Sequence, residues 1–139
     1  MTWWMFSLVS AVAAGATAIL AKIGVAGVPS NVATAVRTLV VLAFAWAIVA
    51  AQGELPAVRE IRGRSLLFLG LSGLATGVSW LAYFRALQLA PASRVAPLDK
   101  LSLAFTIALS ALVLGEKVSL RVAAGAAMIV AGALLTIER

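Results

Sequence analysis

Two reactive residue types are absent from the 139-residue sequence, which contains no cysteine and no histidine, and only 12% of its residues are charged. Without cysteine and histidine there is no disulfide framework, no thiol nucleophile, and no thiolate or imidazole ligand for a metal ion. Soluble domains carry about 25% charged residues, so this scarcity of charge also excludes a soluble domain and a disordered chain. No cofactor is expected, and we predict that the protein is not an enzyme.

Apolar residues make up most of what is present, at 63% of the chain, and the mean hydropathy is +1.09. The net charge is +6, but the Lys and Arg residues lie singly between apolar runs. They therefore lack the clustering that is typical of a nucleic-acid-binding surface, and no nucleic-acid partner is expected. The composition predicts an integral membrane protein, with the lipid bilayer as its surroundings and a multi-pass arrangement in the bacterial inner membrane.

Five apolar runs approach the length that a membrane-spanning helix requires, since a hydrocarbon core about 30 Å thick needs about 20 helical residues. The expected helices cover residues 3–22, 31–51, 65–89, 94–115 and 119–137. The fourth reaches full length only if it includes Asp99 and Lys100, and Pro97 should loosen its hydrogen-bond ladder. The five helices leave no room for a water-soluble domain, so residues 1–139 are expected to form one all-helical membrane domain.

Polar side chains form a stripe along three of the expected helices when each residue is placed about 100° further round the helix axis. The stripes contain Ser7, Ser10 and Thr17 in the first helix, Ser72, Thr76, Ser79 and Tyr83 in the third, and Asp99, Ser102, Thr106 and Ser110 in the fourth. One interpretation is that these helices line a polar cavity, while the other two face lipid or a partner. The alternative is that each hydroxyl bonds the carbonyl one turn back in its own helix.

Ionisable side chains inside a span are costly in free energy, so each requires an explanation. Because successive helices alternate in direction, six of them lie toward one side of the membrane: Lys22, Arg37, Arg85, Arg94, Asp99 and Lys100. Asp99 shares the stripe of the fourth helix, whereas Lys100 points about 100° away and is not expected to pair with it. The cationic end weakly favours an anionic or zwitterionic solute. The alternative for Lys22, Arg37 and Arg85 is that they extend to the lipid headgroups.

Eight residues are the candidates for binding a substrate or a coupling ion. They are chosen from the stripes and from the cationic end: Thr17, Arg37, Ser79, Tyr83, Asp99, Lys100, Ser102 and Thr106.

Three segments, residues 10–37, 73–97 and 108–132, resemble the EamA domain of the drug/metabolite transporter superfamily. The most specific motif is the Leu-Gly-Glu that ends at Glu116, before the glycine-containing last helix, and the next is the Tyr-Phe-x-Ala-Leu stretch that begins at Tyr83. The resemblance covers nearly the whole chain and implies a five-helix transporter repeat whose first, third and fourth helices line the substrate path. Typical members carry two such repeats with inverted topology, whereas this chain has one. It also lacks the acid in the first helix with which the small multidrug resistance proteins couple drug export to protons.

The resemblance implies a transporter of a small polar or amphipathic metabolite that works by alternating access, and a single repeat favours an antiparallel 5+5 homodimer. The distribution of Lys and Arg, which sets orientation in the membrane, agrees with insertion in both directions. One side holds five cations and the other side also five, namely Arg59, Arg62, Arg64, Lys117 and Arg121 against Lys22, Arg37, Arg85, Arg94 and Arg139. The alternatives are a subunit of a two-gene transporter or lipid-linked head-group flippase, and a non-transporting membrane scaffold.

Overall fold

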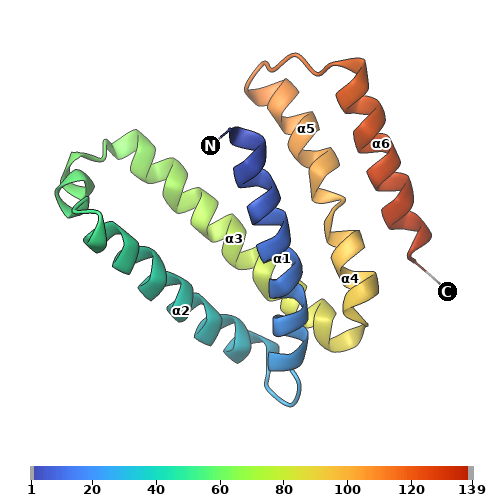
Figure 1. Cartoon of the computed structure of the whole chain (residues 1–139), viewed down its shortest axis with the longest axis horizontal. Helices are drawn as coiled ribbons and strands as arrows, with labels where there is room; N and C mark the ends of the chain where they lie inside the picture. Colours follow the sequence, from blue (N-terminus) through green and yellow to red (C-terminus); the bar gives the residue numbers. More distant parts are fainter. Residues whose placement is uncertain (1, 138–139) are drawn as a thin grey trace. The chain divides into compact units, whose positions relative to one another are not determined.

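A computed structural model describes residues 2–137, and these residues form helices and loops without any strand. In chain order the elements are α1 (Trp3–Gly24), α2 (Ser30–Ala51), the 3-10 helix η1 (Leu55–Glu60), α3 (Gly63–Leu89), α4 (Ala92–Asp99), α5 (Ser102–Val113) and α6 (Leu120–Leu135) (Figure 1). The all-helical class predicted from the sequence is confirmed.

Four helical stretches of the described chain are long and apolar enough to cross a membrane: Trp3–Gly24, Ser30–Ala51, Gly63–Leu89 and Ala92–Val113, the last of which contains both α4 and α5. Helix α6 is also apolar, but it has 16 residues, a length of about 24 Å. Large apolar side chains cover the outside of these helices; Leu112, for example, is 83% exposed. Apolar surface of this extent is typical of a protein that is surrounded by lipid.

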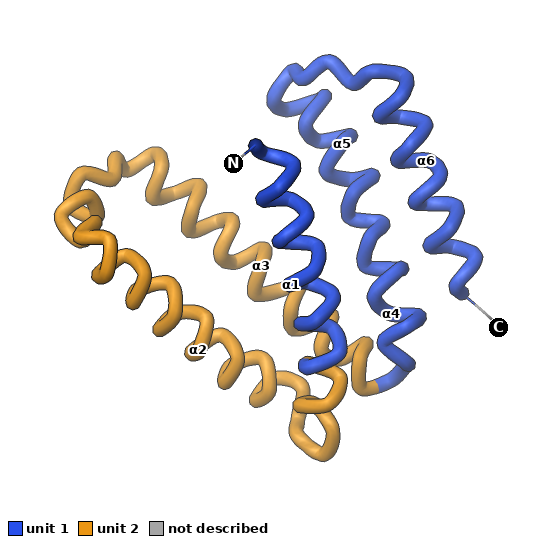
Figure 2. The backbone as a smooth tube through the Cα atoms, in the orientation of Figure 1, with its two compact units in different colours: residues 1–20, 89–139 blue, residues 21–88 orange. Residues whose placement is uncertain are grey.

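The chain divides into two compact units, coloured separately in Figure 2. One unit is Ala21–Gln88, which holds the end of α1, all of α2 and η1, and nearly all of α3. The other unit combines Met1–Leu20 with Leu89–Arg139. Each unit is described by itself below.

In the Ala21–Gln88 unit, α2 and α3 form an antiparallel hairpin joined through η1 (Figure 1). Polar contacts to backbone carbonyls tie its open end together. The Lys22 ammonium donates to the Leu87 carbonyl, and Gln88 Nε2 donates to the Val28 carbonyl at 2.7 Å. The Arg85 guanidinium in turn donates to Gln88 Oε1 at 3.0 Å. These bonds satisfy carbonyls that the loop and the last turn of α3 leave without a helical partner.

In the other unit, α6 packs against α4 and α5. The structure divides the helix expected over residues 94–115 into two, because α4 ends at Asp99 and α5 begins at Ser102. Pro97 has no N–H to donate to the Ser93 carbonyl, which weakens α4 just before the break. The N–H groups of Lys100 and Leu101 bond instead to carbonyls three residues back, at 3.0 and 3.1 Å, which is the tighter 3-10 pattern.

Candidate functional site

Two residues predicted for the site, Arg37 and Tyr83, contact the same aromatic ring. The Arg37 Cζ atom lies 3.4 Å from the centroid of the Trp80 ring. The rings of Trp80 and Tyr83 pack edge to face, with 5.5 Å between their centroids. The ring of Phe84, which is buried, is also near Arg37, with 5.9 Å between its centroid and the Arg37 Cζ atom. Trp80 therefore links a residue of α2 to the polar stripe of α3, and the sequence had not singled it out.

The Arg37 guanidinium lies flat on the Trp80 indole. A distance of 3.4 Å is the contact distance of two flat π systems, and a guanidinium standing on its edge would hold its central carbon farther from the ring. A guanidinium stacked at this distance directs its N–H donors away from the ring rather than into it. Among residues 2–137 no hydrogen bond or carboxylate partner occupies these donors. The ring thus covers one face of the cation and leaves its donor edge available.

Arg37 is placed well inside its helix. It lies seven residues after Ser30, a rise of about 10 Å. The contact between Gln88 and Val28 sets the register of the hairpin, and counting inward along both helices places Arg37 opposite Trp80. The guanidinium consequently extends sideways to α3 rather than along α2. The stack on Trp80 gives Arg37 a partner within the protein, beside the alternative in which it extends to the lipid headgroups.

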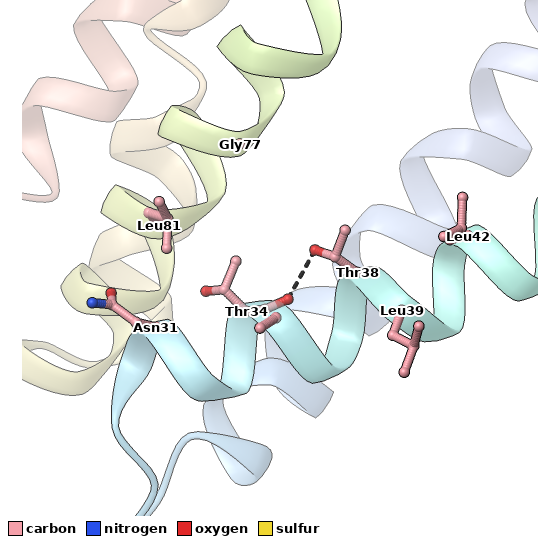
Figure 3. A pocket seen from close by; sticks show the side chains of 8 residues that line it. Asn31, Thr34, Thr38, Leu39, Leu42, Gly77 and Leu81 are labelled. Carbon is pink, nitrogen blue, oxygen red and sulfur yellow. Dashed lines mark hydrogen bonds between the residues drawn. The ribbon is translucent and has the colours of Figure 1, made fainter.

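The same hairpin contains an open groove of about 420 Å³ (Figure 3). It is lined by Asn31, Thr34, Ala35, Thr38, Leu39 and Leu42 of α2 and by Gly77 and Leu81 of α3. The Thr38 hydroxyl donates to the Thr34 carbonyl at 2.8 Å, a bond drawn in Figure 3. The Thr34 hydroxyl donates to the Ser30 carbonyl, also at 2.8 Å. With both hydroxyls bonded inside α2, the lining is mainly apolar, and Arg37 does not belong to it.

Many hydroxyls of the predicted stripes bond within their own helices. They include Thr17 to the Ala13 carbonyl at 2.8 Å, Thr76 to that of Ser72 at 2.9 Å, and Thr106 to that of Ser102 at 2.9 Å. The alternative interpretation of the stripes therefore applies to Thr17 and Thr106. A hydroxyl that donates keeps its lone pairs, so these oxygens remain acceptors for a ligand.

Asp99 and Lys100 form an ion pair, with 3.5 Å between Lys100 Nζ and Asp99 Oδ2. The expectation that they would not pair was wrong. It assumed a regular helix, but α4 ends at Asp99 and Lys100 is its C-terminal cap. Both side chains are partly exposed, at 38% and 51%, and an exposed pair contributes at most about 1 kcal/mol in water.

The eight predicted residues are shared between the two units. Arg37, Ser79 and Tyr83 belong to the Ala21–Gln88 unit, where Ser79 directly precedes Trp80. The other unit holds Thr17 on α1, Thr106 on α5, and Asp99, Lys100 and Ser102 close together in the sequence at the helix break. Within residues 2–137 no three Asp or Glu side chains come together as a metal site requires.

An all-helical chain with four candidate spans, and with a cation held inside one of them, is a multi-pass membrane protein. The model of the EamA-like transporter family matches residues 1–138. The chain therefore belongs to the EamA-like transporter family, as the sequence motifs predicted, and it is a membrane transporter.

A relative from Sinorhizobium sp., named "Uncharacterized transporter in cobO 3'region", is 54% identical to this chain over 134 residues. The alignment covers 96% of this chain and 95% of the relative, so the two proteins have nearly the same length. Among solved structures there is no match.

Proposed function

We propose that the protein moves a small polar or amphipathic metabolite across the bacterial inner membrane by alternating access, as an antiparallel homodimer. The observation that carries this proposal is the family match over residues 1–138 together with a relative of the same length. This chain supplies a single set of helices, whereas many transporters bind their substrate between two inverted sets. Two copies in opposite orientations provide such a pair. In this arrangement α6 is the fifth span.

The distribution of positive charge supports insertion in both orientations. With five spans and Lys100 left out as too deep, each side of the membrane receives five of the Lys and Arg residues; leaving out Arg37 as well, because it lies inside a span, gives five against four, still too small a bias to fix one orientation. Arg139, one of those five on its side, lies outside the described residues. Because an excess of Lys and Arg in the cytoplasmic loops fixes orientation, an even division leaves it open.

The face of α6 that carries Gly125 and Gly132 supports close approach by a partner helix. These two residues are seven apart and so lie on the same side of the helix. Apart from their chain neighbours and the backbone of α6 itself, no atom of the described residues lies within 4 Å of the position that a Cβ would take at either glycine. Because small residues let membrane helices approach closely, this face suits the contact between protomers.

Transport by the purified protein in liposomes tests the proposal. We expect at least one labelled metabolite to exchange faster than in protein-free liposomes, with no second protein added. The substrate or the coupling ion is proposed to contact the eight candidate residues: Thr17, Arg37, Ser79, Tyr83, Asp99, Lys100, Ser102 and Thr106. If flux requires a second gene product, the two-gene transporter or head-group flippase replaces the homodimer. If no solute moves under either condition, the scaffold alternative takes its place.

A further inference from the structure

Arg37 carries a charge that its own unit of the chain does not neutralise. The acids of the Ala21–Gln88 unit are Glu54 and Glu60, and both lie near η1, at the far end of the hairpin. From Arg37 to the last residue of α2, Ala51, the helix rises about 21 Å. Neither acid is therefore within reach, and a cation inside a span requires a compensating group.

The Trp80 ring compensates for only part of this charge. Its π face attracts the cation, but the ring accepts none of the hydrogen bonds that the guanidinium edge offers. Arg64, at the start of α3, is a useful contrast, because its Cζ is 6.0 Å from the Phe68 centroid and it lies at the end of a candidate span. Of these two arginines, only Arg37 is stacked closely on an aromatic ring and lies well inside a candidate span.

We propose that Arg37, held by Trp80, binds the carboxylate or phosphate group of an organic anion, and that this anion is the transported substrate. This inference rests on the proposed transport function and gives its substrate class. The outward edge of a flat guanidinium matches two oxygens of a carboxylate or phosphate, and such paired, charge-assisted hydrogen bonds are strong. Trp80 acts as the positioning residue, because it fixes the plane in which the donors lie.

The surroundings on α3 suit the rest of such a substrate. Thr76 lies one turn before Trp80 and Tyr83 one turn after it, so both flank the indole on the side of the polar stripe. The apolar groove between α2 and α3 includes neither Arg37 nor Trp80 in its lining. The anion site is therefore associated with the stripe rather than with the groove.

Trp80 itself can report on binding. In a variant with Trp3→Phe, Trp4→Phe and Trp46→Phe, Trp80 is the sole indole of the full chain. The protein is placed in phosphatidylcholine nanodiscs and titrated with sodium acetate or inorganic phosphate, against sodium chloride at equal ionic strength. We expect a saturable change in Trp80 emission with acetate or phosphate beyond that with chloride. An identical response to all three salts would overturn the proposal.

Substitutions separate the anion site from a general effect of salt. Arg37→Gln should weaken the apparent affinity about tenfold or more, because hydrogen bonds to a charged group are lost. Arg64→Gln, the matched control, should leave the affinity unchanged. Arg37→Lys keeps the charge without the planar fork and should give an intermediate loss. If Arg37→Gln does not fold, the apparent affinity of Arg37→Lys for the anion is the test instead. Wild-type affinity in the folded variant contradicts the inference.

Two further arms identify the source of the anion and separate this inference from the proposed function. If a lipid headgroup occupies the site, adding phosphatidylglycerol alone should reproduce the emission change and prevent titration by acetate, which overturns the substrate assignment. Continued titration by acetate supports it. Anion binding without flux of any solute contradicts the transport function but not the anion site. Flux whose KM is unchanged by Arg37→Gln contradicts the anion site but not transport.

Discussion

The Arg37 Cζ atom lies over the Trp80 ring, 3.4 Å from its centroid, at a level about 10 Å inside α2. The contact joins the two helices of one hairpin, and it holds a full charge inside a candidate membrane span. A cation–π contact stabilises by about 0.5–1 kcal/mol at an exposed site and by about 2 kcal/mol or more where water is excluded, as we expect inside a membrane span. This stabilisation can be measured separately from any anion that Arg37 binds.

Trp80→Leu should destabilise the protein by about 2 kcal/mol, because the cation loses its ring. Trp46→Leu is the control, since Trp46 is 46% exposed and replacement of one exposed apolar side chain by another costs about 0.5 kcal/mol or less. Unfolding of both variants in the same detergent gives the comparison. Equal losses would show that the stack contributes nothing beyond apolar packing.

Asp99→Asn should abolish transport while the protein still inserts and dimerises. The carboxylate lies at the break between α4 and α5, and an acid within a span is expected to bind a proton, an ion or a substrate amine. Flux in liposomes, together with cross-linking of the variant, measures the two properties separately. Glu116→Gln, in the loop after α5, should transport normally. Full flux in Asp99→Asn would contradict a functional role, and loss of expression would favour the ion pair with Lys100 as a structural one.

Gln88→Ala should destabilise the hairpin by about 1–3 kcal/mol, because it leaves the partly buried Val28 carbonyl without its donor. It also removes the acceptor of Arg85. Gln52→Ala is the matched control, since Gln52 is an exposed cap of α2 whose backbone makes its contacts. Thermal unfolding of the two variants is the measurement. Similar midpoints would mean that the Gln88 amide does not secure the end of the hairpin.

Reporters fused to the C-terminus should be active on both sides of the membrane, because the loop cations divide evenly. The absence of native cysteine makes a second test simple. Gly125→Cys and Gly132→Cys should each give cross-links between oppositely oriented protomers, whereas Leu112→Cys, on a largely exposed part of α5, should not. Activity on one side only would exclude the antiparallel homodimer and favour the two-gene alternative.

The positions of the helices follow from local signals, and the sequence alone places most of them. The run expected over 31–51 is the helix Ser30–Ala51, and the run over 65–89 is Gly63–Leu89. Pro97 also predicts weakened helical hydrogen bonding in the fourth span. The helical hydrogen bonds stop two residues later, and Lys100 comes close to Asp99. Both features depend on the backbone geometry after the proline, for which the sequence has no separate signal.

The contact between Arg37 and Trp80 could not be predicted in the same way. It depends on the register of α2 against α3, which the Gln88 amide and the Val28 carbonyl set at the end of the hairpin. A helical wheel describes one helix at a time. The polar stripe on α3 consists of hydroxyl-bearing side chains and therefore does not include the Trp80 indole. The usable signal was an arginine inside a span without an acid nearby, facing a helix with a tryptophan in its middle.

The hairpin of α2 and α3 is joined by polar contacts at two heights, at Val28 and Gln88 and again at Arg37 and Trp80. Along α3 these levels are eight residues apart, about 12 Å. A single attachment would let one helix pivot about it, whereas two attachments at separate levels oppose sliding of one helix along the other. We therefore expect the α2–α3 hairpin to keep its register during the proposed alternating access, so that the bending falls in other segments.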